Sequence, residues 1–154
     1  MALARIRSLG LLGLAAAGLA GAVSMNGAQA QIFPQEASPA LNYTIHCSGC
    51  HKSDGSGEIN IVPDIRHQVA RYLAVPGGRE YLVQVPGSSN SFLSDKDLAK
   101  LLNYMVREFD PSHVPARFKP YSEAEVTHLR ATPLSEALSV RASLLAELDR
   151  RGLK

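Results

Sequence analysis

The chain has 154 residues, of which 45% are hydrophobic and 19% are charged, so its length fits a single domain and its composition excludes a wholly disordered protein. Sixteen Lys and Arg residues stand against fourteen Asp and Glu residues. Arg5 and Arg7 fall in a segment that we expect to be removed, which leaves fourteen basic and fourteen acidic residues. This neutral balance argues against a nucleic-acid partner and gives no support for binding to an anionic membrane surface.

Residues 1–30 show the three regions of a secretory signal peptide. A start with two arginines precedes an uncharged run of Leu, Ala and Gly over 9–23, and Ala28-Gln29-Ala30 supplies the small residues that a signal peptidase accepts. The apolar run is shorter than the roughly 20 residues of a transmembrane helix. The sequence therefore predicts cleavage after Ala30, export to the periplasm, and a soluble mature protein without a transmembrane segment.

The rest of the chain predicts an all-α fold. Ser38-Pro39 is a typical helix start, because a hydroxyl caps free amides and proline fits the first helical position. This helix should run to about Cys50. Capping residues and apolar spacing predict further helices over 64–74, 94–109 and 133–151, with a capping box at 122–125. Residues 79–85 could form a helix or a strand, and the composition of 53–57 and 86–91 predicts loops.

The chain's two cysteines, Cys47 and Cys50, belong to the pentapeptide Cys-Ser-Gly-Cys-His that ends at His51. C-x-x-C-H is the attachment motif of c-type haem. The two thiols bond to two vinyl groups on one edge of the porphyrin, so they must lie about one helical turn apart on the same side. His51 then lies below the ring, where its imidazole can bind the iron. The motif predicts one covalently bound haem c for each chain.

Three other roles of a C-x-x-C pair lack the context that each requires. A thioredoxin-like redox pair follows a strand in a βαβ unit, and no such pattern precedes Cys47. A zinc site needs a second pair of ligands, and the chain offers only the scattered His67, His113 and His128. A disulfide between cysteines three positions apart closes a very small loop and gains little chain entropy.

Residues 38–110 resemble a class I cytochrome c domain. The helix with the pentapeptide, the glycine-containing loop at 54–57, the segment Val62-Pro63-Asp64-Ile65 and the terminal helix around 98–105 carry this resemblance. It implies that the carbonyl of Pro63, twelve residues after His51, accepts the imidazole N–H and fixes the ring. It also implies that Tyr104 packs on the first helix.

The resemblance further implies an electron carrier and not an enzyme. Such a protein would pass single electrons between redox partners such as a dehydrogenase, another cytochrome or an oxidase. The family's second axial ligand is a Met in the loop before the terminal helix, but here that loop, residues 85–93, contains no Met, His or Lys. Met105 is the one Met after the predicted cleavage site, and its apolar neighbours on the helix favour a core position over iron ligation.

An iron with one protein ligand would be open to small molecules. The alternative function is therefore an open-site, five-coordinate haem protein that binds a small ligand or acts as a weak peroxidase. A peroxidase needs polar groups on the ligand side of the haem, for which Arg79, Glu80 and Gln84 are candidates. Water or Asn90 could also close the position.

Residues 111–154 fall outside the resemblance and should form a C-terminal helical extension of the haem domain at 31–110. Three prolines spread this segment away from the haem helix, and two helices follow. Their apolar faces must be buried, so we expect the extension to cover the surface of the haem domain. A docking surface for a redox partner is the other interpretation.

Overall fold

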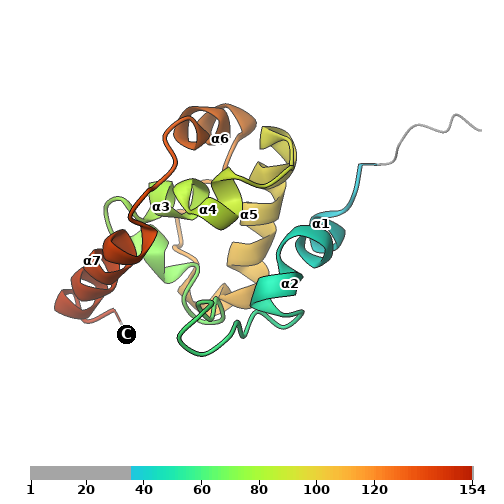
Figure 1. Cartoon of the computed structure of the whole chain (residues 1–154). Coiled ribbons are helices and arrows are strands. Elements are labelled where there is room, and N and C mark those ends of the chain that lie inside the picture. The colour runs from blue at the N-terminus through green and yellow to red at the C-terminus, as the bar shows by residue number, and fades with distance from the viewer. Residues whose placement is uncertain (1–35, 154) are drawn as a thin grey trace, which may run out of the picture. The chain divides into compact units, whose positions relative to one another are not determined.

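A computed structural model describes residues 36–153 of the chain (Figure 1). The predicted signal peptide and its cleavage site lie outside these residues. The described part is helical and contains no β-strand, apart from one isolated antiparallel bridge between Glu58 and Val62, and this confirms the all-α fold class. Among the same residues, no helix has the length and apolar character needed to cross a membrane.

The helices of the described residues follow one another with short connections. In chain order they are α1 (Pro39–His46), α2 (Ser48–His51), the 3-10 helix η1 (Arg71–Ala74), α3 (Gly78–Gln84), α4 (Pro86–Ser89), α5 (Asp95–Phe109), the 3-10 helix η2 (Pro111–His113), α6 (Glu123–Arg130) and α7 (Ala137–Arg150).

The first predicted helix is present but is divided in two. The Ser38 hydroxyl accepts the Leu41 amide at 3.2 Å, which is the expected cap. At Cys47 the backbone leaves the helical region with φ −123°, so α1 ends there and α2 begins. The His51 amide then donates to the Cys47 carbonyl at 2.9 Å. The pentapeptide therefore forms a one-turn helix of its own.

The helix predicted over 64–74 is wrong except for its last turn, η1. The Asp64 carboxylate accepts the backbone amide two residues further on at 2.8 Å, which favours a turn over a helix. His67 then has a positive φ of 56°. The Ala70 amide donates to the carboxylate of Asp110 at 2.8 Å instead of to a helical carbonyl.

Two further segments settle or correct the sequence interpretation. Residues 79–85, for which the sequence allows a helix or a strand, fall mainly in helix α3. Residues 86–91, predicted to be a loop, begin with the one-turn helix α4. Pro86 occupies its first position, and the Val85 carbonyl accepts the amides of Ser88 and Ser89, both at 2.9 Å.

The core lies around α5. Its N-cap is Ser94, whose hydroxyl accepts the Asp97 amide at 3.1 Å. α5 packs against α1, where the rings of Phe109 and Tyr43 have centroids 4.7 Å apart. The ring that contacts α1 here is thus Phe109, while the expected Tyr104 meets Phe109 edge-on at 6.2 Å. The fully buried side chains of α5 are Leu98, Leu101, Leu102 and Val106.

The C-terminal helices pack on the other helices of the described part. α6 contacts α5 and α3, and α7 contacts η1 and α3. The predicted cap of α6 is present, because the Ser122 hydroxyl accepts the Glu125 amide at 3.2 Å. α7 starts at Ala137, later than predicted, and buries Leu144 and Leu148, whereas Leu138 of the expected apolar face is 80% exposed.

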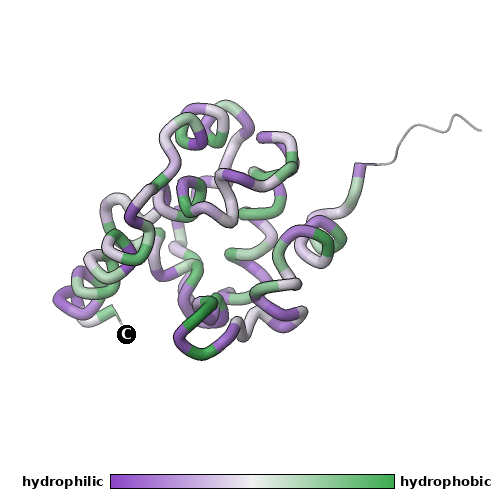
Figure 2. The backbone as a smooth tube through the Cα atoms, viewed as in Figure 1, coloured by the Kyte–Doolittle hydropathy of each residue, from purple (hydrophilic) through white to green (hydrophobic). Residues whose placement is uncertain are grey.

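One strongly hydrophobic loop lies at the surface. Figure 2 shows the segment around residues 59–62 among the most hydrophobic parts of the tube. Ile59 and Ile61 in this loop are exposed. The loop connects the pentapeptide to Pro63, and Ile61 lies at the edge of the cavity described next.

Candidate haem site

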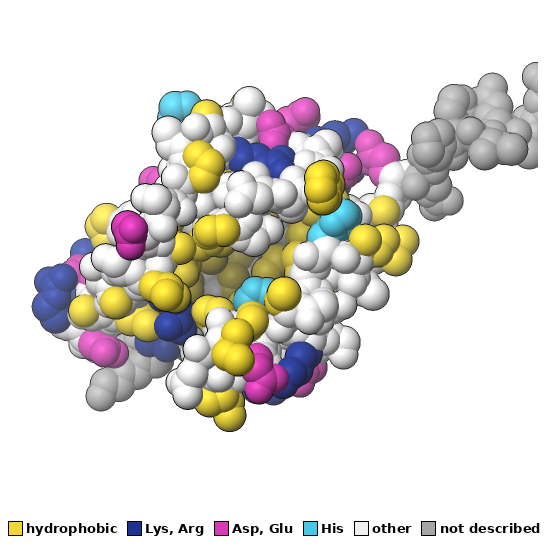
Figure 3. Space-filling model, in the orientation of Figure 1, with side chains coloured by type: hydrophobic (Ala, Val, Ile, Leu, Met, Phe, Trp, Pro, Cys, Tyr) yellow, Lys and Arg dark blue, Asp and Glu magenta, His cyan; other side chains and the backbone are white. Residues whose placement is uncertain are grey.

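An apolar cavity of about 390 Å³ opens on one face of the described residues. Figure 3 shows this hollow with hydrophobic side chains around and inside it. Cofactor sites are typically apolar clefts of about 300–1,000 Å³ with a few polar groups, so the cavity has a suitable size and character. Helices α2, α3, α4, α5 and α7 all contribute to its wall. Among the apolar lining residues are Ile65, Val69, Leu82, Val85, Leu98, Leu101 and Leu102.

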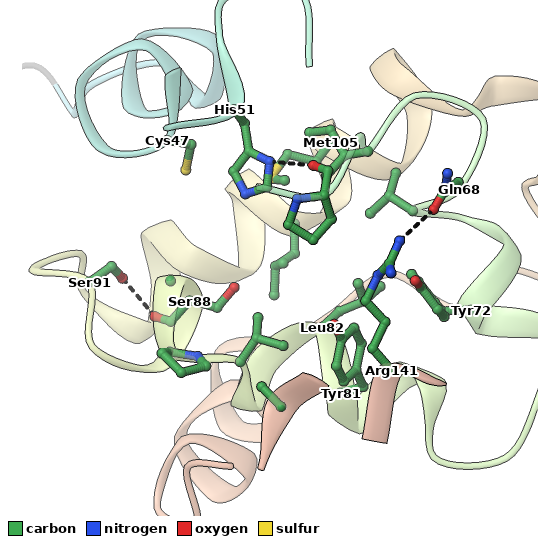
Figure 4. Close-up of a pocket in the computed structure, with 18 of the residues that line it drawn as sticks. Cys47, His51, Gln68, Tyr72, Tyr81, Leu82, Ser88, Ser91, Met105 and Arg141 are labelled. Atoms are coloured by element: carbon green, nitrogen blue, oxygen red, sulfur yellow. Dashed lines mark hydrogen bonds between the residues drawn. The ribbon is translucent and has the colours of Figure 1, made fainter. Parts of the chain in front are cut away.

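His51 presents one ring nitrogen to this cavity. Its Nδ1 lies 3.0 Å from the carbonyl oxygen of Pro63, and because a carbonyl only accepts, Nδ1 carries the proton and donates it. Figure 4 shows the other nitrogen, Nε2, directed toward the open space. Burial lowers the pKa of His51, against the opposing effect of the Pro63 hydrogen bond. The neutral ring therefore has a lone pair on Nε2 for a metal.

A tight loop brings Pro63 back to His51. Gly57 has a φ of 64°, and its amide donates to the His51 carbonyl at 3.1 Å. A Cβ at this position would lie 2.4 Å from the Val62 carbonyl oxygen and 2.7 Å from that of Pro63. Only glycine fits here without displacing the backbone that carries the acceptor.

The two cysteines are free thiols in the structure, and Cys47 lines the cavity while Cys50 is exposed. The Cys50 amide donates to the Cys47 carbonyl at 3.1 Å, so both belong to one turn. Burial raises the pKa of Cys47 to about 11. A thiol that resists ionisation is a poor redox nucleophile, which argues against a thioredoxin-like pair.

A cationic group closes the opposite end of the cavity. Arg141 of α7 donates from Nη2 to the Gln68 side-chain oxygen at 3.2 Å, but its Nε is buried with no partner within residues 36–153. The charge of Arg141 also opposes the rise in pKa that burial causes in Tyr72. Figure 4 shows Arg141, Gln68 and Tyr72 across the cavity from Cys47.

These positions fit haem c, the group that the sequence motif implies. The porphyrin has its vinyl groups on one edge and its two carboxylates on the opposite edge. Cys47 lies at one end of the cavity, and an incompletely bonded guanidinium lies at the other. Burying such a cation is costly unless it meets an anion, and a carboxylate would supply one.

The wall that faces His51 has a different chemistry. Leu82 of α3 and Val85, Pro86, Gly87 and Ser88 at α4 line the cavity there. Figure 4 shows Met105 at the His51 end of the cavity, away from Leu82 and Ser88. A second axial ligand has to approach the iron from the side opposite His51, so the position of Met105 does not favour that role.

The polar residues considered for peroxidase chemistry are used elsewhere. Arg79 forms an ion pair with Glu125 at 2.5 Å, and Gln84 donates to the Thr132 hydroxyl at 2.9 Å. Both therefore bind the C-terminal extension. Neither lines the cavity, nor do Glu80, Asn90 and the other histidines of the described residues, which are His46, His67, His113 and His128.

Arg141, Gln68 and Tyr72 are the site residues that sequence reasoning missed. Arg141 lies in a segment to which the sequence gives no haem-binding role, and Gln68 and Tyr72 lie in the wrongly predicted helix. Neither spacing nor composition distinguishes these residues from ordinary surface positions. Their grouping at one end of the cavity depends on how α7 packs on η1 and α3.

Comparison with known proteins supports the same family. No protein-family model matches the chain. A cytochrome c-552 from Thermus thermophilus is 32% identical over 126 aligned residues, covering 70% of this chain and 92% of that protein. A second cytochrome c-552, from another record of the same species, is also 32% identical over 126 residues, covering 70% of this chain and 82% of that protein.

The similarity reaches further than the sequence motifs indicated. Residues 38–110 make up less than half of the chain, so a match over 70% of it must extend beyond them. The expectation that resemblance to the family is confined to 38–110 is therefore wrong. At this identity and coverage, the chain belongs to the class I c-type cytochromes.

Proposed function

We propose that this cytochrome is an exported monohaem electron carrier that passes single electrons between redox partner proteins. Haem c is joined to Cys47 and Cys50, and His51 is the axial ligand of its iron. Haem supplies the one-electron chemistry when it is bound. The protein's residues hold it, orient its ligand and shield it from water.

One observation carries this proposal: the hydrogen bond between His51 and Pro63 leaves Nε2 directed into an apolar cavity. The Pro63 acceptor fixes the tautomer and the ring orientation, and it makes the imidazole a stronger donor to the metal. The adjacent position of Cys47 on the same cavity wall supports attachment from the same turn.

The extension takes part in holding the cofactor. We assign Arg141, together with Gln68, to the carboxylate edge of the haem, because the buried Nε is otherwise without a partner in the described chain. The apolar wall lowers the local dielectric, and this disfavours the extra positive charge of the oxidised state. α7 is thus part of the proposed binding site as well as a cover for the haem domain.

The electron-carrier role is tested by voltammetry of the purified holoprotein on an electrode. We expect a reversible one-electron wave that survives repeated cycles. A protein that binds haem but shows no reversible wave would contradict the carrier role. Export is tested separately, by N-terminal sequencing of the protein recovered from the periplasm, which should begin at Gln31.

A further inference from the structure

We propose that the wall opposite His51 forms a binding site for a small uncharged diatomic ligand, such as CO or NO, and that the Ser88 hydroxyl donates a hydrogen bond to it. This site depends on the proposed function in one respect, because it takes His51 as the iron's protein ligand. The diatomic ligand would occupy the opposite axial position. It donates a lone pair to the reduced metal, so no electron is transferred when it binds.

The side chains of this wall are poor ligands for haem iron. Leu82 is buried and purely apolar, and it is followed along the wall by Val85, Pro86 and Gly87. Strong axial ligands of haem iron are imidazole, thiolate and thioether groups. The wall thus leaves room for an external ligand while excluding bulk water.

Ser88 provides an available hydrogen-bond donor at this wall. Figure 4 shows its hydroxyl directed into the cavity, and no described residue hydrogen-bonds to that hydroxyl. The neighbouring serines differ in this respect. Ser89 donates its hydroxyl to the Val85 carbonyl at 3.1 Å, and Ser91 donates to the Ser88 carbonyl at 2.9 Å.

The wall is held in place by the C-terminal extension. Arg130 of α6 donates from Nε to the Ser89 carbonyl at 2.9 Å and from Nη1 to the Leu93 carbonyl at 2.8 Å. Its Nη2 donates to the Ser91 carbonyl, and Asp95 pairs with Nη1 at 2.8 Å. The Arg130 side chain is only 17% exposed. These charge-assisted bonds must break before the segment can swing another group toward the iron.

Met105 is the one described residue that could close the position with a thioether. It lies at the His51 end of the cavity, in the middle of α5. Its neighbours Leu101, Leu102 and Val106 are fully buried, so moving Met105 to the opposite wall would require the core helix to shift. We therefore assign Met105 to packing beside the cofactor.

The test uses the reduced holoprotein and CO. A pyridine haemochrome spectrum first establishes that haem c is bound. We then expect CO to shift the Soret band, with one CO bound per haem, in the wild type and in Met105→Leu alike. A spectrum unchanged by CO would overturn the open site and leave haem attachment intact. Absence of haem c would overturn both this site and the proposed function.

Ser88→Ala tests the hydrogen bond, with Ser91→Ala as the matched control from the same wall. The infrared C–O stretch of the CO complex should move to higher wavenumber in Ser88→Ala, because the hydroxyl no longer polarises the bound ligand. It should stay unchanged in Ser91→Ala, whose hydroxyl is bonded to the Ser88 carbonyl. Equal stretches in the wild type and Ser88→Ala would overturn the role of Ser88.

Discussion

Nδ1 of His51 lies 3.0 Å from the carbonyl oxygen of Pro63, twelve residues further along the chain. The acceptor is a backbone atom, so any residue at position 63 can supply it, provided that the loop keeps its shape. Proline restricts that backbone and has no amide of its own to compete. The orientation of the proposed axial ligand is therefore set by loop geometry.

Pro63→Ala should retain covalent haem but shift the reduction potential. The carbonyl remains, but the backbone has more freedom, so the His51 ring loses part of its fixed orientation. Losses in this outer shell of a metal site typically cost about 10–100-fold in affinity or activity. Voltammetry and an acid titration of the visible spectrum measure the effect. Pro120→Ala, at an exposed position away from the cavity, is the control, and equal behaviour of the two variants would contradict the role of Pro63.

Gly57→Ala should destabilise the holoprotein by about 1–3 kcal/mol, the usual range for a residue forced into a strained backbone region. A Cβ at this position would also lie 2.4 Å from the Val62 carbonyl oxygen. Urea unfolding measures the loss of unfolding free energy. Gly49→Ala is a helical control, because its Cβ would meet nothing within 4 Å. If both variants unfold at the same urea concentration, the loop is not constrained as described.

Arg141→Gln should lower the stability of the reduced state's carboxylate contact and shift the reduction potential of the haem. A buried positive charge beside the cofactor disfavours the oxidised state, which carries the greater positive charge, so its removal should lower the potential. Without Arg141, the pKa of the adjacent haem carboxylate should rise, so the pH range over which the potential changes should move upward. Arg141→Lys should shift the potential less.

Arg150→Gln controls for net charge in this experiment. Arg150 lies near the end of the same helix, and its side chain is 73% exposed. Removing this charge should leave the potential and its pH dependence close to those of the wild type. Equal shifts in the Arg141 and Arg150 variants would show that Arg141 has no direct contact with the cofactor.

Glu125→Gln should destabilise the protein at pH 7 and make its stability less sensitive to acid. The hydrogen bond from Arg79 lowers the pKa of Glu125 below its usual value. The ion pair therefore contributes fully above the unfolded-state pKa of about 4.3, and its contribution is lost as the pH falls through the lower folded-state pKa. The loss at neutral pH should be about 1–2 kcal/mol, typical of a hydrogen bond to a charged group.

Urea unfolding of the holoprotein at a series of pH values checks this prediction. Glu123→Gln is the control, because Glu123 lies at the exposed start of the same helix. The difference between wild type and Glu125→Gln should shrink as the pH falls from about 5 to about 3, the range below the unfolded-state pKa and through the lowered folded-state pKa. A constant difference over this range would contradict an ionised Glu125 as the source of the stabilisation.

Local signals in the sequence were sufficient for the helix starts. Ser38, Ser94 and Ser122 each cap the helix that was predicted from them, because a cap involves residues only three positions apart. The pairing of His51 with Pro63 was likewise accessible, since a short loop connects the two residues.

Contacts between distant segments explain what the sequence did not reveal. The helix over 64–74 is interrupted partly because Asp110, forty residues away, accepts the Ala70 amide. Arg141 joins the cavity because α7 folds back onto η1 and α3. A helical pattern also could not show that Leu138 remains exposed at the cavity edge. Each of these outcomes depends on tertiary packing that spacing along the chain does not encode.

The most direct test of haem attachment is the intact mass of the protein after expression with a c-type haem maturation system. We expect the mass of residues 31–154 plus one haem, and haem that stays on the polypeptide during extraction with acidified acetone. The double variant Cys47→Ala, Cys50→Ala should have the mass of the polypeptide alone. Wild-type protein with that same polypeptide mass, or with haem that acidified acetone extracts, would contradict attachment through Cys47 and Cys50.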